Sequence, residues 1–218
     1  MGKVQKLVLS AIYVALAVTL SLIEIPFNGI IPLKLDLSDL VIVIGVLTLG
    51  LWPSLVISIF RFLFRYLIIA INLHGAIVGL YAEGVALLCS ILIIMFTFCG
   101  KKIFHFKAQY VNSIFIGIFS ILMFIFTMVL LNFLFITPTF FSFFSGEYKF
   151  IGFLTFTNDF RFSWFHGDSL SKYFTVIISL YGIFNFIKGL ICIGLGLFIA
   201  NVLNKTILYG KNNAVNNG

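Results

Sequence analysis

Residues 111–136 read VNSIFIGIFSILMFIFTMVLLNFLFI and contain no charged side chain. An apolar run of this length exceeds the roughly 20 residues that an α-helix needs to cross a lipid bilayer. The whole chain has the same character, because 61% of its 218 residues are hydrophobic and only 10% are charged. The apolar residues follow one another without the alternation typical of barrel strands, so the backbone hydrogen bonds must close within helices. The sequence therefore predicts an all-α integral membrane protein.

Glycine, proline and lysine residues divide the other apolar runs into separate spans. The stretch from Leu40 to Leu73 is too long for one crossing, and Gly50 and Pro53 split it into a short helix and a longer one. We expect one domain over residues 1–209, with a long external loop at 138–172 and a disordered Asn- and Gly-rich tail at 210–218. Its six transmembrane helices are expected over residues 7–25, 40–51, 53–72, 76–99, 111–136 and 174–203.

The charged residues are divided unevenly between the two ends of these spans. With six spans, one side holds no acidic residue and carries the lysines Lys3, Lys6, Lys101, Lys102, Lys107, Lys205 and Lys211. Because positively charged loops stay on the inner side, we expect a multi-pass protein of the cell membrane with both termini in the cytoplasm. The net charge of +7 therefore indicates membrane topology rather than a nucleic-acid partner.

The sequence lacks the motifs of an ATPase or of an enzyme. The string nearest to a P-loop, residues 98–102, has no upstream glycine and no Ser or Thr to hold magnesium. Zinc-protease, serine-hydrolase and paired-cysteine motifs are missing, and the histidines are scattered over turns and loops. The cysteines lie in apolar runs or at their ends, where small apolar packing residues are expected. We therefore expect no catalytic residue, no bound metal and no cofactor.

Asn185 and Lys188 interrupt the apolar sequence of the last span. They are three positions apart and project from one helical face. An ionisable group at this depth is costly, and a lysine beside an amide suits a neutral, heteroatom-rich planar ligand. The alternative is a structural ion pair between Lys188 and either Asp39 or Glu83. Asn132, in the fifth span, is either a third member of the same site or a capping or interhelical hydrogen-bonding residue.

Two further pairs of residues lie at helical spacing within spans. Arg61 and Arg65 share one face of the third span. We expect them to pair with acidic residues, namely Glu24, Asp39 or Glu83; the alternative is contact with a ligand. Ala11 and Ala15 allow close helix approach in the first span. They either pack within the chain or form a docking face for another membrane subunit.

Two motifs in the sequence resemble those of a known family, the substrate-capture (S) components of energy-coupling factor (ECF) vitamin transporters. Residues 32–39, PLKLDLSD, are similar to the family's "LKxDxSD" stretch, and residues 184–189, FNFIKG, are similar to its "FNxxKG" stretch. Residues 79–83, GLYAE, loosely resemble its "GELAN" region. The likeness covers the helical core and is to the riboflavin-binding members in particular.

The resemblance implies a six-helix S-component bundle with a vitamin site near its outer face. Asn132, Asn185 and Lys188 match residues that contact the flavin ring in the family. The segment after the first span is implied to form the lid and part of the pocket, through Leu33, Leu35, Asp36 and Asp39. Glu83 stands where the family usually has Asn, and we include it among the candidate binding residues.

The resemblance also implies partners. The Ala11 and Ala15 face is implied to dock on a transmembrane coupling subunit, the T component, which carries two ATPase subunits. Riboflavin is then the transported ligand. The sequence departs from the family at Arg61-Phe62, where Lys-Asn is usual, and in a longer loop at 138–172. One alternative is an S component for another vitamin, such as folate or thiamine.

Another alternative is a membrane assembly protein without a small ligand. This alternative predicts that an acid neutralises Lys188 and that no cavity opens between the spans.

Overall fold

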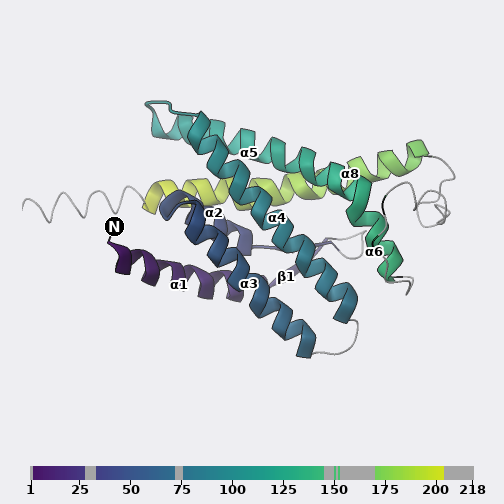
Figure 1. Cartoon of the computed structure of the whole chain (residues 1–218). Coiled ribbons are helices and arrows are strands. Elements are labelled where there is room, and N and C mark those ends of the chain that lie inside the picture. Colours follow the sequence, from purple (N-terminus) through teal and green to yellow (C-terminus); the bar gives the residue numbers. More distant parts are fainter. Residues whose placement is uncertain are drawn as a thin grey trace, which may run out of the picture.

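A computed structural model describes residues 2–27, 33–71, 76–144, 150, 152 and 170–203, which form a helical bundle (Figure 1). Within these residues, five helical stretches are long and apolar enough to cross a membrane. Three of them are single helices, α1 (Lys3–Ser21), α3 (Leu51–Ile71) and α4 (Ala76–Ile103). The fourth is α5 (Gln109–Leu131), which continues as η1 (Asn132–Ile136) and α6 (Thr137–Phe144). The fifth is α8 (Leu170–Gly189), which continues as η3 (Leu190–Leu195) and stays helical to Leu203. A shorter apolar helix, α2 (Ser38–Thr48), and the strands β1 (Glu24–Pro26) and β2 (Lys34–Asp36) complete the described part. The protein is thus a multi-pass, all-α membrane bundle with one small hairpin.

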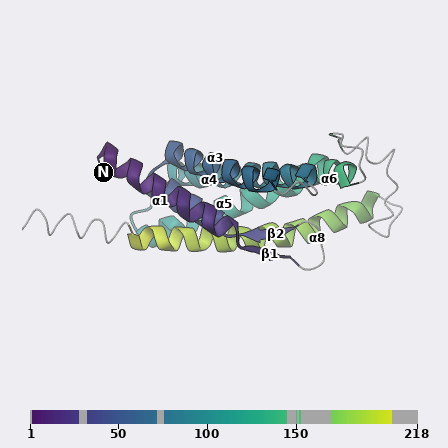
Figure 2. The ribbon, with the colours of Figure 1, turned by 90° about the horizontal axis from the view of Figure 1, so that it is seen from below.

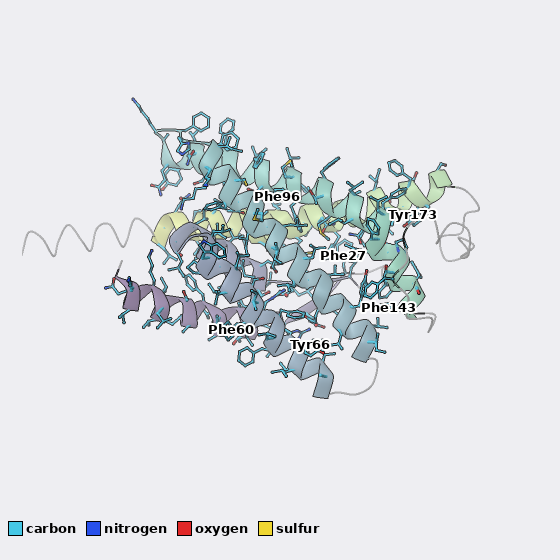
Figure 3. All side chains as sticks on the ribbon, viewed as in Figure 1. Phe27, Phe60, Tyr66, Phe96, Phe143 and Tyr173 are labelled. Atoms are coloured by element: carbon cyan, nitrogen blue, oxygen red, sulfur yellow. The ribbon has the colours of Figure 1, made fainter. Side chains whose placement is uncertain are left out.

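The short helix α2 lies inside the bundle. Its residues 41–46 are all buried, and it contacts α1, α3, α4 and η3. Just after η3, Gly196 approaches α2 so closely that a Cβ atom there would lie 2.8 Å from the Cγ1 atom of Val43. The long helices instead keep apolar side chains on the outside, such as Phe60 of α3, which is 46% exposed (Figure 3). An apolar core inside an apolar outer surface is the pattern expected of a bundle surrounded by lipid.

Local hydrogen bonds set the limits of α2. The Asp36 Oδ1 atom accepts a hydrogen bond from the Ser38 backbone N–H at 2.6 Å, which satisfies a donor at the helix start. At the other end, the N–H groups of Leu49 and Gly50 both donate to the carbonyl of Gly45, and Gly50 has a φ of 98°. A left-handed glycine ends a helix in this way without steric cost. The helix therefore covers 38–48 rather than the 40–51 that the apolar run predicts.

A β-hairpin stands where the sequence predicts only a lid-forming segment. Strand β1 pairs antiparallel with β2, with Ile25 opposite Leu35, and the Phe27 N–H extends the ladder to the Leu33 carbonyl at 3.0 Å. The Phe27 ring packs edge-on against Phe184 of α8 at 5.3 Å. Figure 2 shows the hairpin between the end of α1 and α8. This position places the hairpin against α8 at one side of the bundle.

The expected external loop at 138–172 is partly helical. Its first residues belong to α6, which runs on from α5 through η1, and its last residues begin α8. The rest of this loop, apart from residues 150 and 152, lies outside the described residues, as do the turn at 72–75 and the tail at 210–218.

The described acidic residues are absent from one end of the bundle. Figure 1 places the N-terminus, the connection between α4 and α5 and the last turns after η3 at one end. The described lysines of these segments are Lys3, Lys6, Lys101, Lys102 and Lys107. The acidic residues within the described ranges belong to the hairpin, α2 and α4, and they gather around one cavity.

Candidate functional site

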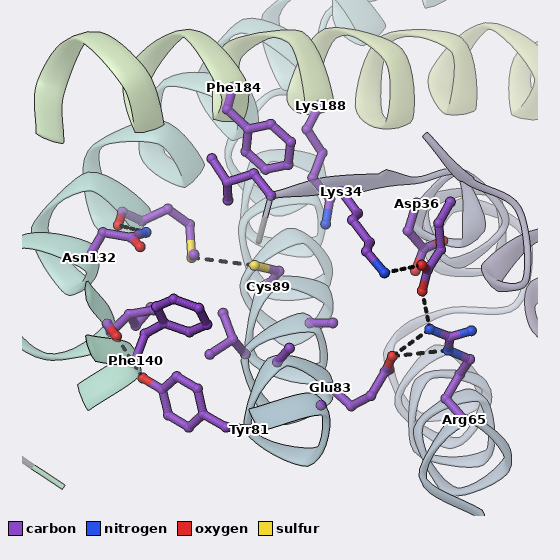
Figure 4. A pocket seen from close by; sticks show the side chains of 18 of the residues that line it. Lys34, Asp36, Arg65, Tyr81, Glu83, Cys89, Asn132, Phe140, Phe184 and Lys188 are labelled. Atoms are coloured by element: carbon purple, nitrogen blue, oxygen red, sulfur yellow. Dashed lines mark hydrogen bonds and ion pairs between the residues drawn. The ribbon is translucent and has the colours of Figure 1, made fainter. Parts of the chain in front are cut away.

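A cavity of about 270 Å³ opens between the hairpin, α3, α4, α5 and α8 (Figure 4). Two of the eight residues predicted to bind a ligand do not line it. Leu35 lies on the opposite face of β2 from Lys34 and Asp36, because side chains alternate along a strand, and Asp39 is buried behind the wall. The structure brings the other six together at the cavity: Leu33, Asp36, Glu83, Asn132, Asn185 and Lys188.

Lys188 takes part in both a structural ion pair and the cavity wall. Its Nζ atom lies 2.7 Å from the Oδ2 atom of Asp39, which is fully buried and also accepts a hydrogen bond from the Ser90 hydroxyl. The predicted alternative of an ion pair with Asp39 is therefore confirmed. An ammonium group has three donors, however, so this pairing leaves others for a ligand. The prediction of the assembly-protein alternative that no cavity opens is wrong.

The two cavity asparagines differ in how their amides are satisfied. Asn132 donates from Nδ2 to the Met128 carbonyl of its own helix at 2.8 Å, and its Oδ1 atom lies 3.5 Å from the Thr137 hydroxyl. Asn185 is 2% exposed, and its Nδ2 atom has no hydrogen-bond partner among the described residues. A buried hydrogen-bond donor without an acceptor costs free energy unless a bound molecule supplies the acceptor. Asn185 lines a cavity that can hold such a molecule. Asn185 is thus the residue best prepared to bond a ligand.

Both helices that carry these residues change to π-helical geometry next to them. The segment η1 begins at Asn132, and η3 begins two residues after Lys188. Short π-helical segments occur frequently at functional sites, because they rotate side chains out of the α-helical register. Nothing in the sequence indicated them.

A chain of ion pairs forms the wall between the hairpin, α3 and α4. Arg65 bonds both Glu83, at 2.8 Å, and Glu24, and Lys34 bonds the other oxygen of Glu24. Burial alone would raise the pKa of Glu24, but the hydrogen bonds and charges of Lys34 and Arg65 outweigh it and hold that pKa below its ordinary value. Glu24 is therefore ionised at neutral pH. The predicted pairing of Arg65 is confirmed.

Arg61 has a different partner from those predicted. It is fully buried, and its Nη1 atom lies 2.6 Å from the Asp36 carboxylate and 2.6 Å from the Ser38 hydroxyl. The prediction of Glu24, Asp39 or Glu83 was wrong because it did not include the hairpin, which carries Asp36 over α3. Arg61 thus holds the strand that lines the cavity.

The apolar part of the cavity wall is aromatic. Tyr181 and Phe184 lie on the same face of α8 as Asn185 and Lys188, at the spacing i, i+3, i+4 and i+7. Opposite them, Tyr81 of α4 donates a hydrogen bond to the Ile136 carbonyl at 2.9 Å (Figure 4). The helical period of α8 was a signal that would have identified its two aromatic residues. The cavity therefore offers ring faces and the Asn132 amide at one end, and the charged groups of Lys34, Asp36, Glu83 and Arg65 at the other (Figure 4).

Two small residues of α1, Ala11 and Ala15, are on the surface of the bundle. Ala11 and Ala15 are exposed, whereas Ala17 is completely buried in the core. Packing within the described part of the chain therefore does not account for Ala11 and Ala15.

Comparison with known proteins identifies the fold only. The sequence matches no protein-family model and no curated protein. The structure is similar to a solved structure of the S component of a bacterial ECF transporter, with a TM-score of 0.59 and 18% sequence identity. The match covers 94% of this chain and 99% of that chain. The chain therefore has an S-component-like bundle over nearly its whole length.

Proposed function

We propose that this chain is the substrate-capture subunit of an ECF-type vitamin importer and that it binds riboflavin on the outer face of the membrane. The observation that carries the proposal is the cavity in which Asn132, Asn185 and Lys188 converge. Its position within a bundle of S-component fold supports a role in ligand capture. Its aromatic walls and polar end suit a planar ring system with a heteroatom-rich edge.

In this proposal the ligand completes the hydrogen bonds of the site. The unpartnered Nδ2 atom of Asn185 donates to an acceptor on the ring edge, and a spare proton of Lys188 donates to a neighbouring one. Phe184 and Tyr181 pack against the ring. The flavin is the cargo of the site.

The energy for transport comes from other chains in this proposal. The sequence has no nucleotide-binding motif, so a T component with two ATPase subunits is the expected partner. The lysine-rich end of the bundle, where α1 begins and the helix that follows η3 ends at Leu203, is assigned to the cytoplasm. The exposed Ala11 and Ala15 face of α1 is assigned to docking on the T component.

The docking assignment predicts a separation of binding from transport. Replacing both Ala11 and Ala15 with leucine is expected to abolish co-purification with the T component and riboflavin uptake, because close helix approach requires small residues. Riboflavin affinity should not change, since neither residue lines the cavity. Ala70→Leu, a matched exchange on the exposed side of α3, is the control and should leave both properties intact. Normal uptake by the double variant would contradict the docking assignment.

The vitamin assignment is tested by purifying the protein and recording its absorption spectrum. A preparation that carries flavin should be yellow, and added folate or thiamine should not displace the flavin. Displacement by either vitamin at lower concentration than riboflavin would favour an S component for that vitamin.

A further inference from the structure

A second pocket, of about 100 Å³, lies at the lysine-rich end of the bundle, where Figure 1 places the connection between α4 and α5. It opens between the ends of α2 and α4, the start of α5 and the helix that follows η3. Among the described residues, none lines both this pocket and the ligand cavity. A water molecule needs only about 10–15 Å³ of a cavity, so the pocket has room for a group the size of a phosphate.

Lys101 is the cation of this pocket. Its Nζ atom donates a hydrogen bond to the Leu47 carbonyl at 3.2 Å, and an ammonium group has two further donors. It forms no ion pair with a described carboxylate, because those carboxylates all lie at or behind the ligand cavity. In contrast, Lys34 and Lys188 at that cavity are each paired with an acid. The pocket therefore carries a net positive charge, which favours an anion.

The other polar side chains of the pocket add donors but no negative charge. The Gln109 amide donates to the Asn201 Oδ1 atom at 3.2 Å, and the Asn201 amide donates to the Ser113 hydroxyl at 2.8 Å. Asn112 accepts from the Phe106 N–H through its Oδ1 atom, a bond that does not use its Nδ2 donors. Each amide has two N–H donors, so all three retain at least one outside these bonds. The first backbone N–H groups of α5, which begins at Gln109, also favour negative charge here.

Exposed aromatic residues place the pocket at the depth of the lipid headgroups. Trp52, near the start of α3, is 76% exposed, and Tyr110, next to Gln109, is exposed as well. Exposed Trp and Tyr residues are enriched at the interface between lipid and water. Along α5 the surface next to the pocket is apolar, with exposed Ile114 and Ile118. An anion with acyl chains therefore finds a polar site and an apolar surface side by side.

We propose that this pocket binds the phosphate of an anionic phospholipid headgroup, with Lys101 as its charged contact. The phosphate oxygens accept hydrogen bonds from the Lys101 ammonium and from the amides of Asn112 and Gln109. Basic pockets between transmembrane helices on the cytoplasmic side are suited to such headgroups. The bound lipid contacts α4, α5 and the last helix together, and it occupies a site separate from the vitamin cavity.

The test measures lipid binding to the purified protein in an uncharged detergent by native mass spectrometry. The probes are phosphatidylglycerol, which is anionic, and phosphatidylcholine, which carries no net charge. Phosphatidylglycerol should bind at least about fivefold more tightly, and Lys101→Gln should weaken its binding by about fivefold or more, the contribution of one lysine at a lipid surface. Lys102→Gln is the matched control, because it removes the neighbouring charge, which lies over the Phe98 ring and outside the pocket. It should retain wild-type binding.

A second pair of variants keeps the test decisive if Lys101→Gln does not fold. Gln109→Glu places a carboxylate in the pocket with a side chain of the same size, and an acid at a helix start favours the helix. Gln5→Glu places the same charge at the exposed start of α1, at the same end of the bundle. Only Gln109→Glu should weaken phosphatidylglycerol binding.

Equal binding of the two lipids, or equal effects of a pocket variant and its control, would overturn the inference. Displacement of phosphatidylglycerol by an equal concentration of inorganic phosphate would also overturn it, because the site would then belong to a soluble anion. None of these measurements involves riboflavin, so the inference and the proposed function fail or hold independently.

Discussion

Replacing Lys188 with methionine is expected to lower the free energy of unfolding by about 3–5 kcal/mol, because it leaves the buried Asp39 carboxylate without its cation. Methionine matches the length of the lysine stem, so the loss is one of charge rather than of packing. Asp39→Asn is expected to have a similar cost, since it leaves the Lys188 ammonium unpaired. Thermal or denaturant unfolding of the purified protein in detergent measures both effects.

The double variant Asp39→Asn/Lys188→Met tests whether the two residues act as a pair. It contains neither buried charge, so it should be clearly more stable than either single variant. Losses that simply add in the double variant would show that the two side chains do not interact, in contradiction to their 2.7 Å contact.

The same double variant separates the structural role of Lys188 from its role toward a ligand. Its fold no longer suffers from an unpaired charge, yet it has lost the ammonium donor at the cavity. If Lys188 bonds the ligand, riboflavin should bind about tenfold more weakly or worse, because a hydrogen bond to a charged group contributes about 1.5–3 kcal/mol. Wild-type affinity in a folded double variant would limit Lys188 to a structural role.

Asn185→Leu is expected to weaken riboflavin binding by about 5- to 150-fold without a comparable loss of stability. Leucine has nearly the same size as asparagine, but it leaves a buried acceptor of the ligand unpaired, which costs about 1–3 kcal/mol. The fold loses little, because the Asn185 Nδ2 atom makes no hydrogen bond within the described part of the chain. Flavin titration and unfolding of the same preparation measure the two effects together.

The control for this prediction is Asn112→Leu at the opposite end of the bundle. Asn112 accepts a hydrogen bond from the Phe106 N–H in the connection between α4 and α5, away from the cavity. Its exchange should leave flavin affinity unchanged. A large stability loss in Asn185→Leu with unchanged flavin affinity would instead assign Asn185 to the fold.

The features that the sequence predicted are those that depend on one helix at a time. Continuous apolar runs predicted the helical membrane bundle, because a lipid-embedded backbone must satisfy its own hydrogen bonds. Helical spacing placed Asn185 and Lys188 on one face, and both line the cavity. The same spacing placed Arg65 near acids, and it pairs with two of them.

The features that the sequence did not predict depend on tertiary contacts. The three-residue strands β1 and β2 are too short to show a period, and tertiary contacts stabilise them, among them the ion pairs with Arg61 and Arg65 of α3. Because the hairpin was not predicted, the ion pair between Asp36 and Arg61 was not predicted either. For the same reason, the sequence did not show that Leu35 points away from the cavity. The π-helical segments η1 and η3 have no recognised composition signal, so their effect on Asn132 and Lys188 was also missed.

The most direct test of flavin capture is a titration of riboflavin with the purified, flavin-free protein, followed by the quenching of riboflavin fluorescence. Aromatic side chains that pack against the flavin ring are expected to quench it, so the account predicts saturable quenching with one riboflavin per chain. Asn185→Leu should shift the same curve to higher protein concentration. A folded protein that leaves riboflavin fluorescence unchanged at every concentration would contradict the account.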